Sequence, residues 1–309
     1  MSQPQISLVT GTAGRVEELA RLGASLAAQT LQEFEWIIVD QNKDDRLEGL
    51  LKEEVRDMTI RRLRCTPNLS VGLNLGGDAA KAPIIGFPDD DCWFDSGLLI
   101  SIVALFADHP DWDGMVCRIV DEEGRQAISS WPARSSLCNR FNAWFRVAGT
   151  GLFLRREAFK ALGGFDPTLG LGDGLFLAAH DLDLVLRALE VGMQIQYVGE
   201  AVVRHPQMLR RTSKSHQQKA FSYAIGAGRL MRDHRMPFWW VCAAVLAPLL
   251  RTLLAAVRLQ GTSAGVHARE AIGRLCGWAG AGGGRQNALL SFHGFLIASH
   301  RAWRQSGRR

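Results

Sequence analysis

The sequence predicts an α/β protein with a mixed, mostly parallel sheet, helices on both of its faces, and a separate helical region at the C-terminal end. Two observations predict this architecture. Short apolar runs alternate with amphipathic helical patterns over the first 120 residues, as in repeated βαβ units. Charge is also divided unevenly: residues 201–309 carry 17 Lys and Arg but two acids, whereas residues 1–200 carry 19 Lys and Arg and 29 Asp and Glu.

The expected elements of the first half alternate between strand and helix. Runs rich in β-branched and aromatic residues predict strands, and apolar residues three or four positions apart predict helices. Strands are expected over residues 6–9, 36–39, 59–65, 83–88 and 113–120. Helices are expected over residues 16–26, 45–56, 73–81 and 96–107. The segment 121–146 is expected to be an irregular insertion.

Further elements are expected between residues 149 and 206. Gly149 to Leu154 leads into a helix that ends at Gly163-Gly164, since glycine commonly follows a helix. The Gly- and Leu-rich segment 165–179 is expected to form a mobile loop over a site. A helix is expected from Leu182, with Gly192 beyond its end. Two strands, 194–198 and 201–204, are expected to close the globular part.

The C-terminal region combines positive charge with an apolar run. Thirteen residues, 238–250, carry no charge, and Arg251 then interrupts the run, which Pro248 is expected to kink. A spanning helix needs about 20 apolar residues, so we expect an interfacial or re-entrant segment anchored by Trp239 and Trp240. A buried core helix is the alternative. The charge predicts an acidic partner, and the apolar run favours anionic lipid over nucleic acid. The glycine-rich stretch 279–284 predicts a flexible break.

The cysteines and the N-terminal residues predict a compartment. Six cysteines are scattered without a C-x-x-C pair, which favours reduced thiols in the cytoplasm over a disulfide framework or a zinc site. Residues 1–5, Met-Ser-Gln-Pro-Gln, contain neither a basic nor an apolar segment of the kind found in signal peptides. We therefore expect a cytoplasmic protein.

Three consecutive aspartates, Asp89, Asp90 and Asp91, follow the apolar run 83–88. Carboxylates this close repel one another unless a cation holds them, and hard divalent ions such as Mg²⁺ and Mn²⁺ prefer carboxylate oxygen. The triplet therefore predicts a metal site. The alternative is a solvated turn that caps the helix starting near Asp95.

Other polar groups are expected at the same edge of the sheet. Asp40 follows the strand 36–39, and residues 68–74 are expected to form a polar, glycine-containing loop before a helix. His180-Asp181-Leu182-Asp183 opens a later helix. In α/β sheets, ligands bind at the carboxyl ends of the strands, so these groups are expected to share one crevice.

Taken in order, these motifs resemble the family 2 glycosyltransferases of the GT-A fold. The resemblance extends over about residues 5–206. It rests on the order of the motifs along the chain, because each motif alone is weak evidence. The matching segments are Ser7–Arg15, Val39–Asn42, Phe87–Trp93, Gly149–Gly151, Arg155–Asp166, His180–Leu184 and Val202–Pro206.

The resemblance implies a metal-dependent, inverting sugar transfer from a nucleoside-diphosphate sugar, with Mn or Mg as cofactor. It implies a catalytic domain over 1–206, with a nucleotide-binding half (about 1–120) and an acceptor-side half (about 121–206), followed by the helical region 207–309. The donor-binding residues would be Thr10, Gly11, Arg15, Asp40, Asn68, Gly72, Asn74, Asp89 and Asp90. The metal ligands would be Asp89, Asp91 and His205, the acceptor-side residues Gly149, Thr150, Gly151 and His180, and the catalytic base Asp181.

The sequence departs from the family pattern at one position of this set. The family usually has Glu-Asp where this chain has His180-Asp181. His180 is expected either to hydrogen-bond the acceptor or to be a neutral packed histidine. Asp181 is expected to be the base, with a helix cap as the alternative. Asp183 is expected to be a negative charge at the helix start that the helix dipole favours. For His205, the alternative to metal binding is an ordinary histidine at the end of a strand.

The basic, Trp-bearing C-terminal region indicates the setting of the reaction, because it could hold the enzyme at the cytoplasmic leaflet. The acceptor would be a glycan or a lipid-linked intermediate of bacterial polysaccharide or surface-glycan synthesis. The enzyme would be cytoplasmic and peripheral or monotopic at the inner face of the plasma membrane, with no nucleic acid partner. Two other classes remain open: a nucleotidyltransferase, for whose triphosphate loop residues 11–15 are a faint match, and a non-catalytic, membrane-bound glycan-binding or scaffold protein.

Overall fold

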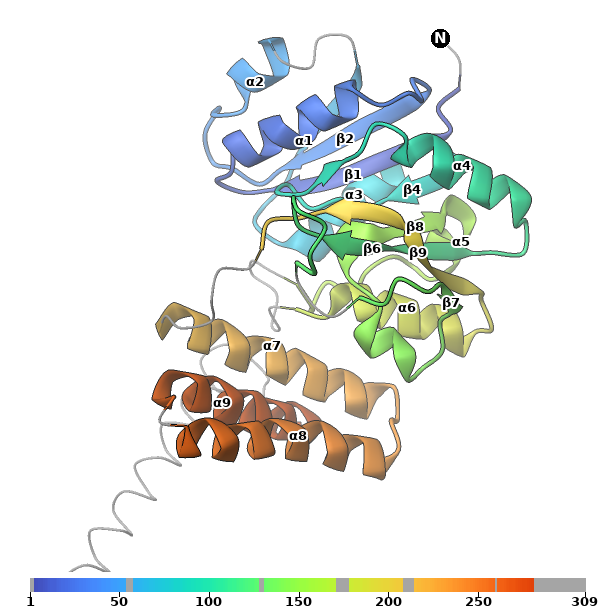
Figure 1. The fold of residues 1–309 in the computed structure, drawn as a ribbon. Coiled ribbons are helices and arrows are strands. Elements are labelled where there is room, and N and C mark those ends of the chain that lie inside the picture. The colour runs from blue at the N-terminus through green and yellow to red at the C-terminus, as the bar shows by residue number, and fades with distance from the viewer. Residues whose placement is uncertain are drawn as a thin grey trace, which may run out of the picture. The chain divides into compact units, whose positions relative to one another are not determined.

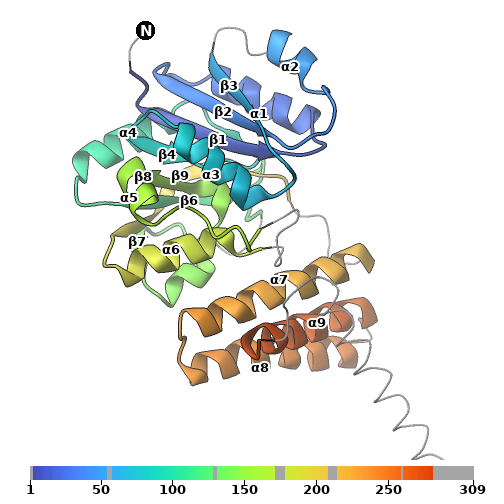
Figure 2. The same ribbon diagram turned by 180° about the vertical axis from the view of Figure 1, so that it is seen from behind.

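The structure, a computed structural model, describes residues 3–53, 58–127, 131–170, 178–207, 214–258 and 260–280. The chain divides into two compact units. The first comprises residues 1–167 and 180–209, and the second comprises residues 168–179 and 210–309. Figures 1 and 2 show the elements of both units from opposite sides.

The first unit is built on one mixed sheet. Among the described residues, nine strands join in the order β3-β2-β1-β4-β8-β6-β9-β5, with β7 paired to β9. The long ladders are parallel (β1 with β2, β2 with β3, and β6 with β9), whereas the antiparallel ladders are short. The strands are β1 (Ile6–Thr12), β2 (Phe34–Asp40), β3 (Thr59–Arg64), β4 (Ile84–Gly86), β5 (Trp93–Phe94), β6 (Gly114–Val120), β7 (Ser136–Leu137), β8 (Leu152–Arg155) and β9 (Ile195–Arg204).

Helices cover both faces of this sheet, as the alternating pattern predicts. α1 (Glu17–Ala27) and α4 (Leu98–Asp108) share one apolar core with alternate residues of β1 and β2. On the opposite face, α3 (Leu69–Ala79) approaches β1 and β2 closely, since a Cβ at Gly76 would overlap Val9. Figure 1 shows α1 in front of the sheet and Figure 2 shows α3 in front of it. The predicted α/β fold class is therefore confirmed.

Shorter elements complete the first unit. α2 (Glu48–Glu53) follows β2, and α5 (Arg156–Ala161) follows β8. The glycine stop predicted for α5 is present, because Gly163 and Gly164 both have positive φ. The insertion between β6 and β8 contains β7 and two 3₁₀ turns, η1 (Asn142–Phe145) and η2 (Gly149–Gly151). The helix α6 (His180–Glu190) precedes β9.

The predicted loop over residues 68–74 is wrong. These residues belong to α3, which begins at Leu69, and the carboxamide oxygen of Asn68 caps it by accepting the Val71 N–H at 3.0 Å. The polar and glycine residues of this stretch suggested a loop. Gly72 instead lets the helix pack closely on β2, since a Cβ there would lie 3.1 Å from Val39.

Two other boundaries also differ from the prediction. The expected strands 194–198 and 201–204 form a single strand, β9, whose pairing with β6 shifts between Cys117 and Arg118. Such a bulge lets one strand run on while extra residues bend out of the ladder. The helix expected from Leu182 begins at His180. Residues 171–177 of the expected mobile loop over 165–179 lie outside the described residues.

The second unit contains three helices among its described residues: α7 (Lys214–Asp233), α8 (Phe238–Val257) and α9 (Gly261–Trp278). α9 packs against both α7 and α8. Glycines permit the close approach of α9 to α7, because a Cβ at Gly273 would lie 2.7 Å from the carbonyl oxygen of Phe221, and one at Gly277 would overlap the backbone of Ile225. The prediction for residues 279–284 falls mainly outside the described residues.

The apolar run forms one long helix, α8, which continues through Pro248. The helix is unbroken at that proline, and the expected kink stays a prediction. α8 has 20 residues, and its most apolar 18-residue stretch has a mean hydropathy of 2.0. Only 17% of that stretch is buried, which argues against the buried-core alternative. Its length and composition would suffice to cross a membrane. One such helix is weak evidence of crossing, because length and composition alone do not separate spanning from interfacial helices.

Candidate functional site

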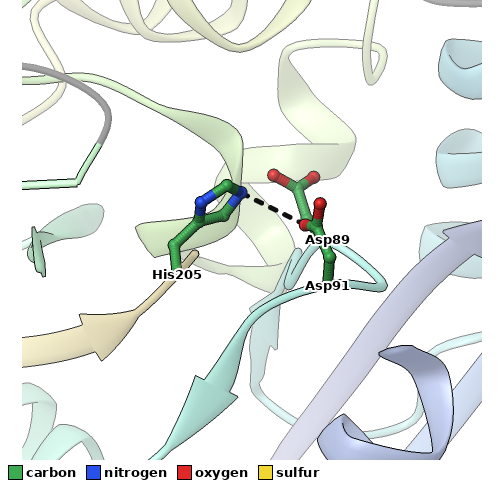
Figure 3. A group of neighbouring side chains, drawn as sticks. All are labelled: Asp89, Asp91 and His205. Carbon is green, nitrogen blue, oxygen red and sulfur yellow. Dashed lines mark ion pairs between the residues drawn. The ribbon is translucent and has the colours of Figure 1, made fainter. Parts of the chain in front are cut away.

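Asp89, Asp91 and His205 come together at the carboxyl ends of β4 and β9. One ligand atom from each residue lies within 4.8 Å of the others. Figure 3 shows the two carboxylates side by side, with the His205 imidazole facing Asp91. The Nε2 atom of His205 lies 3.2 Å from Asp91 Oδ1. Carboxylate oxygens with an imidazole nitrogen form a suitable ligand set for Mn²⁺ or Mg²⁺.

The electrostatics of the three residues favour an added cation. Among the described residues, the Asp89 carboxylate makes no hydrogen bond or ion pair. Burial and the negative charge of Asp91 raise the pKa of Asp89 to about 7. Burial also acts on Asp91, but the hydrogen bond and charge of His205 and the charge of Arg15 lower its pKa below the ordinary value. A divalent ion would supply the positive charge that Asp89 lacks, so the residues fit a metal.

The middle aspartate, Asp90, has a different environment. Its carboxylate accepts hydrogen bonds from Thr12 Oγ1 at 2.8 Å and from Arg15 Nη1 at 2.7 Å. Arg15 Nη1 also lies 2.6 Å from Asp91 Oδ2. The loop after β1 is thereby tied to the aspartate turn. Arg15 remains 45% exposed, so a donor could reach its guanidinium.

The turn η2 connects the aspartate turn to Asp181. The backbone N–H of Gly149 donates to Asp181 Oδ2 at 2.7 Å, and the N–H of Asp89 donates to Thr150 Oγ1 at 3.4 Å. Gly151 packs on β6, where a Cβ would meet the Cys117 carbonyl oxygen at 3.0 Å. The charge of Asp181 is also among the causes that raise the pKa of Asp89. The predicted acceptor-side residues and the predicted base therefore lie beside the candidate metal site.

The polar residues at the start of α6 have different roles. Asp181 lies in the first turn of the helix rather than before it, which does not fit the cap alternative. Asp183 is buried and forms an ion pair with Arg187 at 2.8 Å, and Arg187 also donates to the carbonyl oxygens of Leu162 and Gly164. Asp183 therefore ties α6 to the end of α5, a structural role.

His180 occupies the position where the family usually has Glu. Its ring packs against Phe165 with a centroid distance of 5.4 Å. Burial lowers the pKa of His180, although the nearby charges of Asp181 and Asp183 act to raise it. Its buried Nδ1 atom has no hydrogen-bond partner among the described residues. The arrangement fits a neutral imidazole, and an acceptor contact stays a prediction.

Asp40 lies at the end of β2 with its carboxylate fully buried. It accepts hydrogen bonds from the Asn42 side chain at 2.8 Å and from Arg62 Nε at 2.9 Å. Asn42 Oδ1 in turn accepts the N–H of Gly14 at 2.7 Å, where φ is +84°. Burial acts to raise the pKa of Asp40, but these partners lower it below its ordinary value. This network holds together the loops that follow β1 and β2.

Five other predicted donor-binding residues make contacts inside the protein. Thr10 Oγ1 is buried and accepts from Trp36 Nε1 at 3.0 Å. Asn68 Nδ2 donates to the Pro167 carbonyl, and Asn74 exchanges two hydrogen bonds with the backbone of Phe165. Both asparagines therefore tie α3 to the segment after α5. Close packing is the observed role of Gly11 and Gly72, and donor contact stays a prediction for all five residues.

The sequence analysis missed three residues that organise the site. Thr12 holds Asp90, Arg62 holds Asp40, and Arg187 holds Asp183. Arg62 lies within the run Arg61-Arg62-Leu63-Arg64 on β3, and three arginines in one strand could have indicated an ion pair with a nearby acid. Arg187 stands four residues after Asp183, the helical spacing for an ion pair. Thr12 has no local signal, because Asp90 is 78 positions away.

A mixed α/β sheet with clustered acids at its carboxyl edge is the architecture of the GT-A fold. The model of the glycosyl transferase family 2 matches residues 7–163. The chain belongs to this family, and it is a glycosyltransferase. Comparison with curated proteins gave no match.

Solved structures support the fold assignment. Residues 1–349 of S. aureus TarS are 14% identical, with 89% of this chain and 92% of that chain covered at a TM-score of 0.57. The same fragment in complex with UDP-GlcNAc is 12% identical, with the same coverage and TM-score. The mannosyltransferase PcManGT from Pyrobaculum calidifontis, in complex with GDP-Man and Mn²⁺, is 17% identical, with 98% of this chain and 83% of that chain covered at a TM-score of 0.56. At these identities the similarity shows the fold alone.

Proposed function

We propose that the protein is a metal-dependent, inverting glycosyltransferase that moves a sugar from a nucleoside-diphosphate donor to a hydroxyl of a glycan or lipid-linked acceptor. The acceptor would belong to bacterial polysaccharide or surface-glycan synthesis. The observation that carries the proposal is the cluster of Asp89, Asp91 and His205, in which the Asp89 carboxylate makes no hydrogen bond or ion pair to the described residues. The nucleotide sugars and Mn²⁺ bound by the structurally similar proteins are consistent with it.

Asp89, Asp91 and His205 would hold a Mn²⁺ or Mg²⁺ ion. When bound, such an ion neutralises charge on a diphosphate leaving group. Arg15, which is close to two of the aspartates and half exposed, would add a second positive charge near the diphosphate. The loops after β1 and β2, joined through Asn42, would form the nucleotide side of the site.

Asp181 would be the general base. The N–H of Gly149 and the N–H of Leu182 each donate to one oxygen of its carboxylate, which fixes the orientation of the group. Each oxygen retains a lone pair, so the carboxylate can accept the proton of an acceptor hydroxyl as that oxygen attacks the donor sugar. A single displacement of this kind inverts the anomeric carbon and forms no covalent enzyme intermediate.

A nucleotide-sugar panel tests the proposal. We expect one or more donors to raise the melting temperature in the presence of Mn²⁺ and to have little effect with EDTA, because a ligand that binds only the folded state stabilises it. Incubation of that donor with acceptor should then release nucleoside diphosphate. A nucleotidyltransferase would instead release pyrophosphate when it is given a nucleoside triphosphate and a sugar phosphate. No stabilisation by any donor would favour a non-catalytic glycan-binding protein.

We also propose that the second unit binds the inner face of the plasma membrane through α8. Its large exposed side chains are Phe238, Trp239, Leu246, Leu249, Leu250, Leu253, Leu254 and Val257. The opposite side of the helix includes the buried Val241, Pro248 and Ala255. One packed and one exposed apolar side favour a helix that lies in the interface. Arg251 and Arg258 are exposed on the same helix and would attract anionic lipid.

Replacing Leu253 with Glu should weaken binding to anionic vesicles by about tenfold or more, because it removes a leucine that would insert into the lipid and adds charge repulsion. Leu253 is 64% exposed, so folding in solution should change little. Vesicle co-sedimentation measures the effect. Ile100→Glu, at a 49% exposed position on α4, is the matched control and should bind like the wild type. Equal binding of Leu253→Glu and the wild type would contradict the proposal.

A further inference from the structure

Arg118 on β6 and Arg146 after η1 have no counter-charge. Among the described residues, neither guanidinium makes a hydrogen bond or an ion pair. Arg118 Nε, Arg146 Nε and Arg146 Nη1 are each buried without a partner. Both side chains are nevertheless partly exposed, so a ligand can reach them. Native proteins leave few buried polar atoms without a hydrogen bond, and an atom left so can indicate a site where a ligand or an ion binds.

Both arginines lie around Tyr197 on β9. The Arg146 guanidinium carbon is 5.1 Å from the centre of the Tyr197 ring. Tyr197 pairs with Val116 on β6, so Arg118, two residues further along β6, is on the same face of the sheet. Burial raises the pKa of Tyr197 to about 12, and the charges of Arg118 and Arg146 act to lower it, which agrees with their closeness.

Two further unpaired polar atoms surround the same tyrosine. Trp131 stacks on Tyr197 with a centroid distance of 6.3 Å, and Ser136 pairs with Tyr197 across β7 and β9. Trp131 Nε1 and Ser136 Oγ are both buried without a hydrogen-bond partner. The cluster therefore presents two positive charges and neutral donors, and none of the four side chains makes a bond to a carboxylate of the described residues.

A bulge in β9 lies beside this cluster. The register between β6 and β9 shifts immediately before Arg118. The N–H of Gly199, within the bulge, donates to Ser135 Oγ at 2.8 Å, and the Tyr197 hydroxyl donates to the Pro132 carbonyl at 2.6 Å. These bonds hold the segment 131–137 against β9. Bulges are frequent next to active sites, where they redirect side chains.

The cluster is joined by short stretches of backbone to the residues assigned to the acceptor. Arg146 is three positions before Gly149, whose N–H donates to Asp181. Arg118 directly follows Cys117, against which Gly151 packs. Both arginines are thus connected to η2, the turn that joins the aspartate turn to the proposed base. An acceptor whose hydroxyl faces Asp181 could place another of its groups near them.

We propose that Arg118 and Arg146, with the Trp131 and Ser136 donors, bind an anionic group of the acceptor, a carboxylate or a phosphate. This inference rests on the proposed sugar transfer, since it names the chemistry of the acceptor at that site. A guanidinium matches the geometry of either group through paired N–H donors. The enzyme would thereby select charged over neutral acceptors.

Direct binding of small saccharides tests the inference. The full-length protein is first saturated with Mn²⁺ and the nucleoside diphosphate, UDP or GDP, that stabilises it, so that the diphosphate position is filled. It is then titrated calorimetrically with glucuronate, glucose 6-phosphate and glucose. We expect the wild type to bind at least one of the two anionic sugars about tenfold or more tightly than glucose. Preference between glucuronate and glucose 6-phosphate identifies the anionic group.

Variants connect the selectivity to the arginines. Arg118→Gln and Arg146→Gln should each weaken binding of the anionic sugar by about tenfold or more, while Arg146→Lys should retain part of it. Stabilisation by Mn²⁺ and nucleoside diphosphate should be unchanged in all of them. Arg134→Gln, an exposed arginine in the same insertion, is the matched control and should behave like the wild type.

Three results would overturn the inference. If the wild type binds nucleotide but binds the anionic sugars no more tightly than glucose, the proposed anion site is wrong while the proposed sugar transfer still stands. Unchanged binding in both Gln variants would place the anion elsewhere. A parallel titration uses nucleotide-free protein: anionic-sugar binding that is present there and lost after saturation with nucleoside diphosphate would mean that the donor, not the acceptor, occupies the arginines. Absent Mn²⁺-dependent nucleotide binding in the wild type would instead overturn the proposed function, and the acceptor assignment with it.

Discussion

Asp91→Asn should abolish Mn²⁺-dependent donor binding and lower turnover by at least about 10²-fold, because a neutral amide is a weaker ligand for a hard cation. Asp91 is also the aspartate that both His205 and Arg15 contact, so its charge organises the whole ligand set. Calorimetric titration of donor with and without Mn²⁺, together with a turnover assay, measures the effect.

The matched control for this variant is Asp108→Asn, an exposed carboxylate at the end of α4 that lies outside the candidate site. It should keep wild-type binding and turnover. Because Asp91→Asn also removes ion pairs, its melting temperature without ligand is measured first. If a folded Asp91→Asn variant binds donor more tightly with Mn²⁺ than without it, as the wild type should, Asp91 is not the metal ligand and the assignment is wrong.

Asp181→Asn should leave donor binding nearly intact and lower transfer by about 10² to 10⁴, the usual contribution of a general base. The amide is nearly the same size and can still accept one of the two backbone hydrogen bonds that hold the carboxylate. It cannot take the acceptor proton. Donor affinity and transfer rate are measured on the same preparation.

Asp183→Asn gives a control within the same helical turn. It breaks the ion pair with Arg187 and should reduce stability by about 1–3 kcal/mol while the folded enzyme keeps its turnover. The reverse pattern, in which Asp181→Asn is active and Asp183→Asn is inactive although folded, would move the base to Asp183 and contradict the assignment.

Residues at strand ends were the most predictable part of the site. His205 is far from Asp89 and Asp91 in sequence, but the aspartate triplet and His205 each follow an apolar strand, and the ends of such strands meet at one edge of the sheet. The alternation of strands and helices was predictable for the same reason, since each pattern has its own period. These inferences require only local sequence and the topology of the fold.

Other features depend on contacts that no local pattern reveals. The stretch from Asn68 to Asn74 has the composition of a loop, yet packing of Gly72 on β2 and capping by Asn68 make it the start of a helix. Arg118 and Arg146 are 28 positions apart, and both lie near Tyr197 of β9. The register shift between β6 and β9 likewise has no local signal in the sequence.

A crystal structure grown with Mn²⁺ and the nucleoside diphosphate that stabilises the protein tests the central claim most directly. Anomalous scattering locates manganese independently of the protein atoms. We predict a single strong peak at about 2.0–2.3 Å from a carboxylate oxygen of Asp91, with Asp89 or His205 as a further protein ligand and the diphosphate completing the shell. An ordered nucleotide whose manganese ion is held by other residues, or that binds without any metal, would contradict the account.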